Sequence, residues 1–192
     1  MPRYADYHRT VIGYHGTTRR AALEIVQGLR DFEPSANDDD WLGHGVYFWE
    51  YVPQQAWLWA DQRRRAKKWN DEVAVVASMI RLGNCFDLLD PENVKQLEAA
   101  YQEYRRVNVD SGRVPVNVRS RKRLNCSVFE FAFAGFATVD SAVDTCRSVF
   151  VPSVRSGSIW RGSGINPEAH IQVCVRNAKC ILGTWLVKPA RD

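Results

Sequence analysis

The sequence lacks any apolar run near the roughly 18 to 20 residues that a membrane-spanning helix needs, and its first residues are polar. These absences predict no membrane anchor and no secretory signal, so we expect a cytoplasmic location. The cysteines form no Cys-x-x-Cys pair, and the four histidines show no ligand spacing. Neither a disulfide framework nor a metal site is therefore indicated, and we interpret the cysteines as small core residues. They are Cys85, Cys126, Cys146, Cys174 and Cys180.

The composition is that of a folded globular protein. The chain has 192 residues, of which 45% are hydrophobic and 25% charged, with seven tryptophans. It shows no internal repeat and no convincing linker, so residues 1–192 are predicted to form a single domain. The formal charge of +4 is modest but concentrated in Arg63–Arg65, Lys67–Lys68 and Arg119–Arg123. These clusters suit a phosphate-rich partner, although from charge alone a solvated helix face and an exposed loop are the favoured explanation.

Residue patterns predict an α+β fold. β-branched and aromatic runs favour strands, while Gly, Pro and Asp clusters favour turns and loops at 32–40 and 107–123, the latter exposed and basic. Proline at a first turn and apolar spacings of three and four favour helices. The predicted strands are 11–15, 46–49, 73–80, 143–151, 170–176 and 180–187, and the predicted helices are 18–29, capped by Thr17 or Thr18, 54–69, 91–106 and 125–137.

Two glycine-containing motifs stand out. Tyr14-His15-Gly16-Thr17 ends the first predicted strand, and Gly43-His44-Gly45-Val46-Tyr47-Phe48 leads into the second. Together they resemble the first two signature motifs of the ADP-ribosyltransferases of the diphtheria-toxin and poly(ADP-ribose) polymerase kind. Small uncharacterised bacterial proteins carrying the same motifs also look similar over much of the chain. The resemblance implies an ADP-ribosyltransferase-like fold, in which two small packed β-sheets and surrounding helices enclose an NAD cleft.

The resemblance assigns roles to residues of both motifs. His15, Gly16 and Tyr47 would clamp the nicotinamide half of NAD, with Tyr14, Thr17, Gly45 and Phe48 beside them. Their chemistry fits independently of the family. An imidazole can exchange a hydrogen bond with a ribose hydroxyl, a glycine leaves its backbone open to a planar carboxamide, and a tyrosine ring offers a stacking surface.

The family's third element, a glutamate on a later strand, is replaced here. The alternation of the predicted strand 170–176 places His170, Gln172 and Cys174 on one face, and Gln172 stands where the glutamate is expected. A glutamine orients a hydroxyl but supplies no negative charge. Three explanations stay open: Gln172 works together with His15 and Tyr47 as the catalytic set, a carboxylate substitutes, or the domain binds NAD without turnover. The candidate carboxylates are Glu168, Glu130 and Glu50.

Other polar residues near these motifs receive weaker predictions. His170 is read either as a site residue or as a hydrogen-bonded core histidine, and His44 as an exposed residue that could touch the cofactor. Arg155 and Arg161 could contact a pyrophosphate, with surface charge as the simpler explanation.

The resulting functional prediction is a mono-ADP-ribosyltransferase that uses NAD as co-substrate and no metal. The macromolecular acceptor is RNA or DNA, slightly favoured over protein. A small domain of this kind resembles bacterial toxins of toxin–antitoxin or phage-defence systems, which implies an antitoxin partner. The alternatives are an NAD glycohydrolase and a non-catalytic module that binds NAD or nucleic acid.

Overall fold

The computed structural model describes residues 7–109, 112, 114–118, 121–137, 142–151 and 157–188, and these residues form the predicted α+β fold. The strands are β1 (Tyr7–Thr18), β2 (Val46–Glu50), β3 (Val73–Gly83), β4 (Cys85–Asp87), β5 (Thr145–Phe150), β6 (His170–Val175) and β7 (Ile181–Leu186). The helices are α1 (Arg19–Val26), α2 (Pro53–Lys67), α3 (Pro91–Asn108) and α4 (Arg123–Ala137), and a 3₁₀ turn covers Ala178–Cys180.

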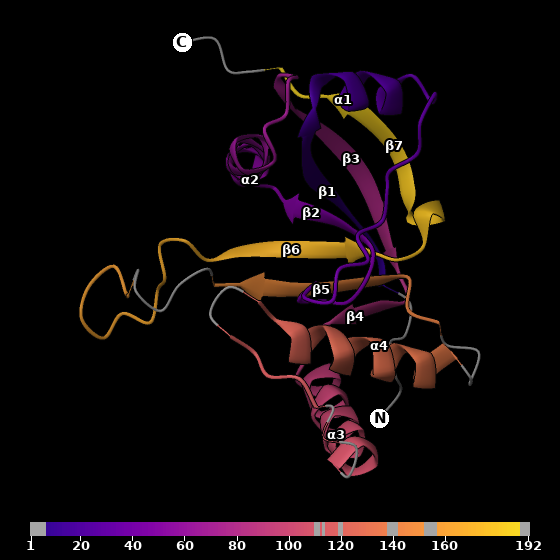
Figure 1. Ribbon diagram of the computed structural model, residues 1–192, viewed down its shortest axis with the longest axis vertical. Helices are drawn as coiled ribbons and strands as arrows, with labels where there is room; N and C mark the ends of the chain where they lie inside the picture. Colours follow the sequence, from indigo (N-terminus) through magenta and orange to yellow (C-terminus); the bar gives the residue numbers. More distant parts are fainter. Residues whose placement is uncertain are drawn as a thin grey trace.

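The prediction of two packed sheets is wrong, because the strands form one seven-stranded sheet in the order β4-β5-β6-β2-β1-β3-β7. β4 and β5 are parallel and the other neighbours antiparallel. The physical reason lies at the centre, where β1 and β2 are paired only at Gly13 with Glu50 and at Tyr14 with Trp49. Figure 1 shows the consequence: the halves β1-β3-β7 and β4-β5-β6 diverge on either side of β2 but remain hydrogen-bonded through it.

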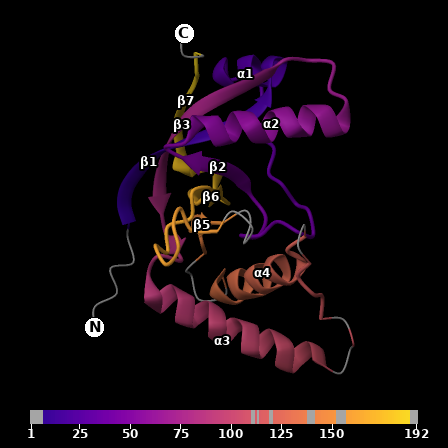
Figure 2. The ribbon, with the colours of Figure 1, turned by 90° about the vertical axis from the view of Figure 1, so that its left-hand side faces the viewer.

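Helices cover the two halves separately. α2 packs on β1 and β3 through a cluster that contains Trp49, Ala56 and Val75, whereas α4 packs on β4, β5 and β6 through Phe86, Phe129 and their neighbours. α3 lies against α4 as an outer layer. Figure 2 shows α2 and α4 on the same side of the sheet, with the segment that follows α1 passing between their levels.

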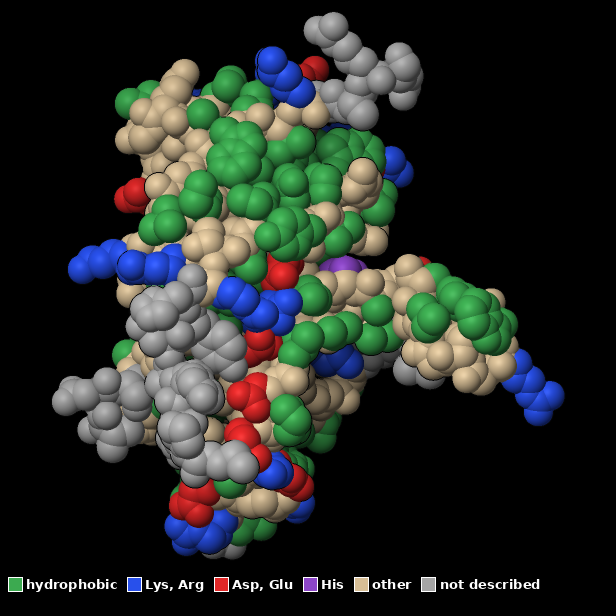
Figure 3. Space-filling model, turned by 180° about the vertical axis from the view of Figure 1, so that it is seen from behind, with side chains coloured by type: hydrophobic (Ala, Val, Ile, Leu, Met, Phe, Trp, Pro, Cys, Tyr) green, Lys and Arg blue, Asp and Glu red, His purple; other side chains and the backbone are tan. Residues whose placement is uncertain are grey.

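Large hydrophobic side chains are also exposed at the surface of the first half. Tyr51, Trp57, Met79, Leu182 and Trp185 are exposed large hydrophobic residues of β3, β7 and the neighbourhood of α2. Figure 3 shows apolar side chains gathered over this half, while Lys, Arg, Asp and Glu side chains are more frequent over the other.

Gly16 explains how closely α2 approaches the sheet. A Cβ atom at this position would lie 2.0 Å from the Ala56 carbonyl oxygen and 2.8 Å from the Ala60 Cβ. Only a glycine allows this strand-to-helix distance, since both obstacles belong to the helix backbone or to its short side chains.

The element boundaries correct two predictions from the sequence. α3 extends to Asn108, so the connection expected at 107–123 begins later, and within its described residues Val118 and Arg121 form an isolated bridge. Arg119 and Ser120 lie outside the described residues. β4, with only three residues, was not predicted. All five cysteines are buried and free, which confirms their interpretation as core residues.

Candidate functional site

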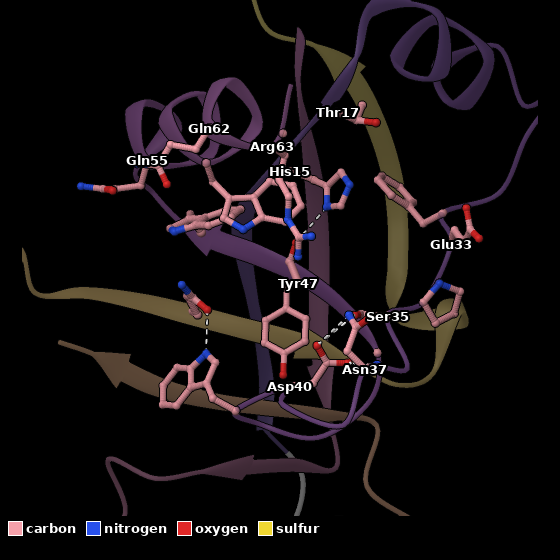
Figure 4. A pocket seen from close by; sticks show the side chains of 18 of the residues that line it. His15, Thr17, Glu33, Ser35, Asn37, Asp40, Tyr47, Gln55, Gln62 and Arg63 are labelled. Carbon is pink, nitrogen blue, oxygen red and sulfur yellow. Dashed lines mark hydrogen bonds between the residues drawn. The ribbon is translucent and has the colours of Figure 1, made fainter. Parts of the chain in front are cut away.

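A cleft of about 1080 Å³ opens where β1 and β2 diverge. Its walls are the cleft-side face of α2, the start of α1, the segment 30–41 and the ends of β5 and β6. The predicted site residues that line it are His15, Gly16, Thr17, Gly45, Tyr47 and Gln172. Figure 4 shows His15 and Tyr47 in the middle of the cleft, with Gln55, Gln62 and Arg63 coming from α2. The structure therefore brings the two glycine motifs together.

His15 is held as a neutral imidazole. Its Nδ1 lies 2.9 Å from the Tyr47 carbonyl oxygen, which can only accept, so Nδ1 carries the proton and Nε2 keeps a lone pair. The ring packs edge-on against Phe32 and at a tilt against Phe48. Burial lowers the pKa of His15, and the hydrogen bond to Tyr47 only partly opposes this effect. The side chain is thus a fixed hydrogen-bond acceptor in the cleft.

The backbone of Gly16 faces the cleft. Tyr51 N–H donates to the Ile12 carbonyl over 3.0 Å, so the backbone groups of Ile12 point toward β2. Residues two apart in a strand direct their backbone groups to the same edge, and Gly16 is therefore in phase with Ile12. The pairing of β1 with β2 ends at Tyr14. Gly16 consequently directs its N–H and C=O toward the cleft, beyond the last residue of β1 that pairs with β2.

The register on the other side of β1 leads to the same orientation. Gly16 is opposite Val75 of β3, and Val187 N–H donates to the Val75 carbonyl over 3.0 Å. Val75 thus directs its backbone toward β7, which makes Gly16 and Val75 a non-hydrogen-bonded pair. Both backbone groups of Gly16 are free of this ladder and can bind a planar donor–acceptor group such as a carboxamide.

Tyr47 is anchored by the glycine turn before it. Its hydroxyl donates to the Gly43 carbonyl over 2.7 Å and accepts from the Leu42 N–H over 3.0 Å. Burial raises the pKa of Tyr47, so the phenol stays protonated and cannot act as a base. Gly43 itself has a φ of +81°, a conformation that favours glycine. The turn therefore fixes the aromatic ring as a rigid surface within the cleft.

Tyr14 and Phe48 occupy other positions. Phe48 is fully buried in the central core, and Tyr14 packs with Trp49 and Ala56 beneath α2. Neither side chain is among the described residues that line the cleft. Both support the site from behind, Phe48 through its contact with the His15 ring.

Gln172 belongs to a neutral hydrogen-bond network. Its Oε1 accepts from the Trp41 indole over 2.8 Å, and its amide nitrogen lies 3.2 Å from His170 Nε2. His170 Nδ1 lies 2.8 Å from the Glu168 carbonyl, so Nε2 is an acceptor, which also receives the Trp49 indole N–H over 3.2 Å. Burial lowers the pKa of His170 in spite of the Glu168 contact. The network orients Gln172 and leaves it without charge.

The three candidate carboxylates have different surroundings. Glu168 is exposed and lines the cleft. Glu50 is buried and bonded through both oxygens to Arg147, which also holds Asp87. Among the described cleft-lining residues Glu50 is absent, so of these two only Glu168 can reach a bound ligand.

Glu130 supports the glycine turn instead of lining the cleft. It accepts from the His44 N–H over 2.7 Å and from Arg176 over 2.6 Å. Burial opposes its ionisation, but these two donors outweigh that effect and lower the pKa of Glu130. The His44 ring lies 3.6 Å from the Cys126 sulfur. Neither His44 nor the exposed Arg161 is among the described residues that line the cleft. Arg155 is outside the described residues.

The structure adds residues outside the two glycine motifs to the site. Asp40 fixes the segment 30–41 by accepting from the Ser35 hydroxyl and the Asn37 N–H, each over 2.9 Å. Trp41 holds Gln172, and Arg63 reaches the cleft from α2. The three-residue spacing of Asn37 and Asp40 is typical of a side-chain-stabilised turn, but no sequence signal indicated the Trp41 contact.

Comparison with known proteins yields one partial match. The chain is 30% identical over 91 residues to the uncharacterized protein MJ0359 of Methanocaldococcus jannaschii. The match covers 46% of this chain and 42% of that protein, so it spans less than half of either. No protein-family model and no solved structure matches the chain.

The described residues contain no group of three or more His, Cys, Asp or Glu side chains arranged to hold a metal ion. None of their helices has the length and apolar character required to cross a bilayer.

Proposed function

We propose that this protein is a mono-ADP-ribosyltransferase that takes NAD into the cleft and transfers ADP-ribose to a macromolecule. The observation that carries the proposal is the convergence of the His15 lone pair, the open backbone edge of Gly16 and the anchored Tyr47 ring in one cleft. These three groups come from two strands that separate at this point.

Each group matches one part of a nicotinamide riboside. The Gly16 N–H and C=O pair with the carboxamide oxygen and nitrogen, and the Tyr47 ring stacks on the pyridinium. His15 Nε2 accepts from a ribose hydroxyl. The cleft volume of about 1080 Å³ lies just above the range typical of small-molecule sites, roughly 300 to 1000 Å³, which suits a dinucleotide.

The reaction breaks the bond between C1′ of the ribose and the nicotinamide nitrogen. The bonding electron pair stays on nicotinamide and neutralises its positive charge, while C1′ acquires oxocarbenium character. Holding the leaving ring in place favours this step. Gln172 orients the ribose but supplies no negative charge, so we assign the exposed carboxylate of Glu168, which lies near Gln172 in the chain and lines the cleft, as the base for the proton of the acceptor.

The neutral network around Gln172 also favours a second candidate function. If no carboxylate assists the acceptor, water can attack C1′ and the protein is an NAD glycohydrolase. A domain that binds NAD or nucleic acid without turnover is the limiting case. The proposed biological setting is a toxin–antitoxin or phage-defence system, in which an antitoxin protein would restrain the enzyme.

Incubation with NAD labelled in the adenylate tests these candidates. Label transferred from NAD to nuclease-sensitive or protease-sensitive material of a cell lysate supports the transferase. Nicotinamide release that is equal with and without RNA, DNA or lysate protein would instead identify the glycohydrolase. His15→Ala and Tyr47→Phe serve as paired variants, because the second keeps the ring and removes only the hydroxyl that anchors it.

A further inference from the structure

One face of α2 presents a line of side chains to the cleft. Gln55, Trp59, Arg63 and Lys67 are spaced by four residues and all line the cleft. Because residues four apart are neighbours on a helix surface, they form one continuous row. The row runs from the first turn of the helix to its last turn.

The two cations of this row differ from their neighbours on α2. Arg64 and Arg65 both pair with Asp61, over 3.0 and 2.7 Å. The guanidinium of Arg63 instead lies 5.0 Å from the centre of the Trp59 ring. In the described part of the chain neither Arg63 nor Lys67 forms an ion pair with a carboxylate. The charge that faces the cleft from α2 is therefore uncompensated.

The aromatic residues beside these cations complete the pattern. Trp59 packs against Trp49 and supports the Arg63 guanidinium, and Trp69 lines the cleft beyond the end of α2. Planar guanidinium and indole groups are surfaces on which unpaired bases stack, and a neighbouring lysine suits a phosphate. Stacking of this kind requires bases that are not already paired in a duplex.

Most of the acidic side chains of the cleft lie away from α2. The carboxylates of Asp31, Glu33, Asp39 and Asp40 belong to the segment 30–41, whose own cation Arg30 pairs with Glu24 and Glu33, and Glu168 precedes β6. Arg63 and Lys67 lie on α2, and Lys122 lies just before α4. Asp40 is moreover engaged in its own turn. A polyanion consequently finds its complement along α2, away from the acidic segment.

We propose that single-stranded nucleic acid is the acceptor and follows the α2 row, with a base on the Trp59–Arg63 surface and phosphates at Arg63 and Lys67. The acceptor role rests on the proposed function, whereas the binding site does not. A lone pair of the nucleotide forms the new bond to C1′ as the bond to nicotinamide breaks. Nicotinamide leaves with the electron pair, and the proton of the nucleotide passes to Glu168 or water.

Binding is measured by fluorescence anisotropy with a 5′-labelled 12-nucleotide single strand, as RNA and as DNA, and with the corresponding duplex. The test variant is Arg63→Gln with Lys67→Gln. Its matched control is Arg64→Gln with Arg65→Gln, which removes the same charge from the same helix. Thermal unfolding of both variants verifies that they are folded.

A plot of the logarithm of the association constant against the logarithm of the salt concentration has a negative slope. The test variant is expected to make this slope shallower by about 1.4, since each single-strand phosphate contact contributes roughly 0.7. At 0.1 M salt this corresponds to an affinity about 25-fold weaker, if the affinities converge at 1 M. The control should lose less than about threefold, and the duplex should bind more weakly than either single strand. Equal losses in the two variants, or equal binding of the duplex, overturn the proposal.

The labelled-NAD experiment separates this inference from the proposed function. Binding that depends on Arg63 and Lys67, without nicotinamide release under any condition, supports the binding site and refutes the transferase. Nicotinamide release with label only in protease-sensitive, nuclease-resistant product identifies a protein acceptor and refutes the nucleic-acid proposal. Label in nuclease-sensitive product that is lost in the test variant and kept in the control supports both.

Discussion

Gly16→Ala separates two reasons for a glycine at this position. The sequence suggested that a ligand must approach the backbone, whereas the structure shows that α2 must approach it. An added Cβ would lie 2.0 Å from the Ala56 carbonyl oxygen, against the 3.4 Å at which ordinary van der Waals contact begins. The helix must therefore move away by about 1.4 Å, because the obstacle is backbone and no rotamer change relieves it.

The expected cost follows from this displacement. Overpacking a close-packed interface costs about 1 to 3 kcal/mol, and a clash with backbone belongs at the upper end. For a domain of this size 1 kcal/mol corresponds to roughly 2 to 4 °C in Tm, so Gly16→Ala should lower Tm by about 6 to 12 °C. NAD binding, followed by calorimetry below the melting range, should also weaken, since α2 carries the cleft wall with Arg63.

Gly183→Ala is the matched control, because Gly183 lies in β7 of the same sheet and an added Cβ there meets no atom within 4 Å. We expect it to melt within about 2 °C of the unchanged protein or slightly higher, since glycine is unfavourable in strands. If Gly16→Ala melts like Gly183→Ala, the close approach of α2 is refuted. Loss of NAD binding without loss of stability would favour the ligand explanation.

Three further outcomes are expected. His15→Ala should slow nicotinamide release at least about tenfold, as loss of one hydrogen bond to the ligand costs about 1.4 kcal/mol, measured by steady-state kinetics with folding checked by circular dichroism. Arg147→Met leaves the buried Glu50 without its cation and Asp87 paired only with the exposed Arg9 among the described residues, and it should cost about 3 to 5 kcal/mol, visible as a Tm lower by roughly 6 to 20 °C. The exposed Arg105→Met should have little effect. Gln172→Glu places a carboxylate against the Nε2 lone pair of His170 and should raise the pKa of His170 above its ordinary value of 6.5. The stability that protonated His170 then contributes is present below pH 6.5 and is lost as the pH rises. In the unchanged protein the pKa of His170 is lowered, so the stability of the fold instead falls as the pH drops below 6.5. Curves of Tm against pH from 5 to 8 should therefore differ in slope between the variant and the unchanged protein. Parallel curves would contradict the hydrogen-bond geometry around Gln172.

Local patterns predicted most elements because local forces determine them. Pro53 and Pro91 stand at the first turns of α2 and α3, and the Thr18 hydroxyl caps α1 by accepting from the Ala21 N–H, as the sequence indicated. The β-branched run from Val73 forms β3. Both glycine motifs reach one cleft, although their joint function remains a prediction.

Features that depend on long-range pairing could not be predicted. β4 has three residues and exists because β5, some sixty residues later, lies beside it in parallel. The continuity of the sheet depends on two residue pairs between β1 and β2, which no periodicity reveals. Glu130 and Glu50 look like equivalent candidates in the sequence, yet ion pairs with Arg176 and Arg147 commit both to structural roles.

The substitution of glutamine for glutamate at position 172 is consistent with its surroundings. A carboxylate there would face the His170 Nε2 lone pair, which accepts from Trp49 while Nδ1 is committed to the Glu168 carbonyl. The protein would then have to protonate a buried imidazole, whose pKa burial already lowers. An amide satisfies the same geometry, accepting from Trp41 and donating to His170, without burying a charge. In the proposed reaction, the negative charge that stabilises a ribosyl cation would therefore come from another carboxylate of the cleft, such as the exposed Glu168, or from an anionic acceptor such as a nucleic acid.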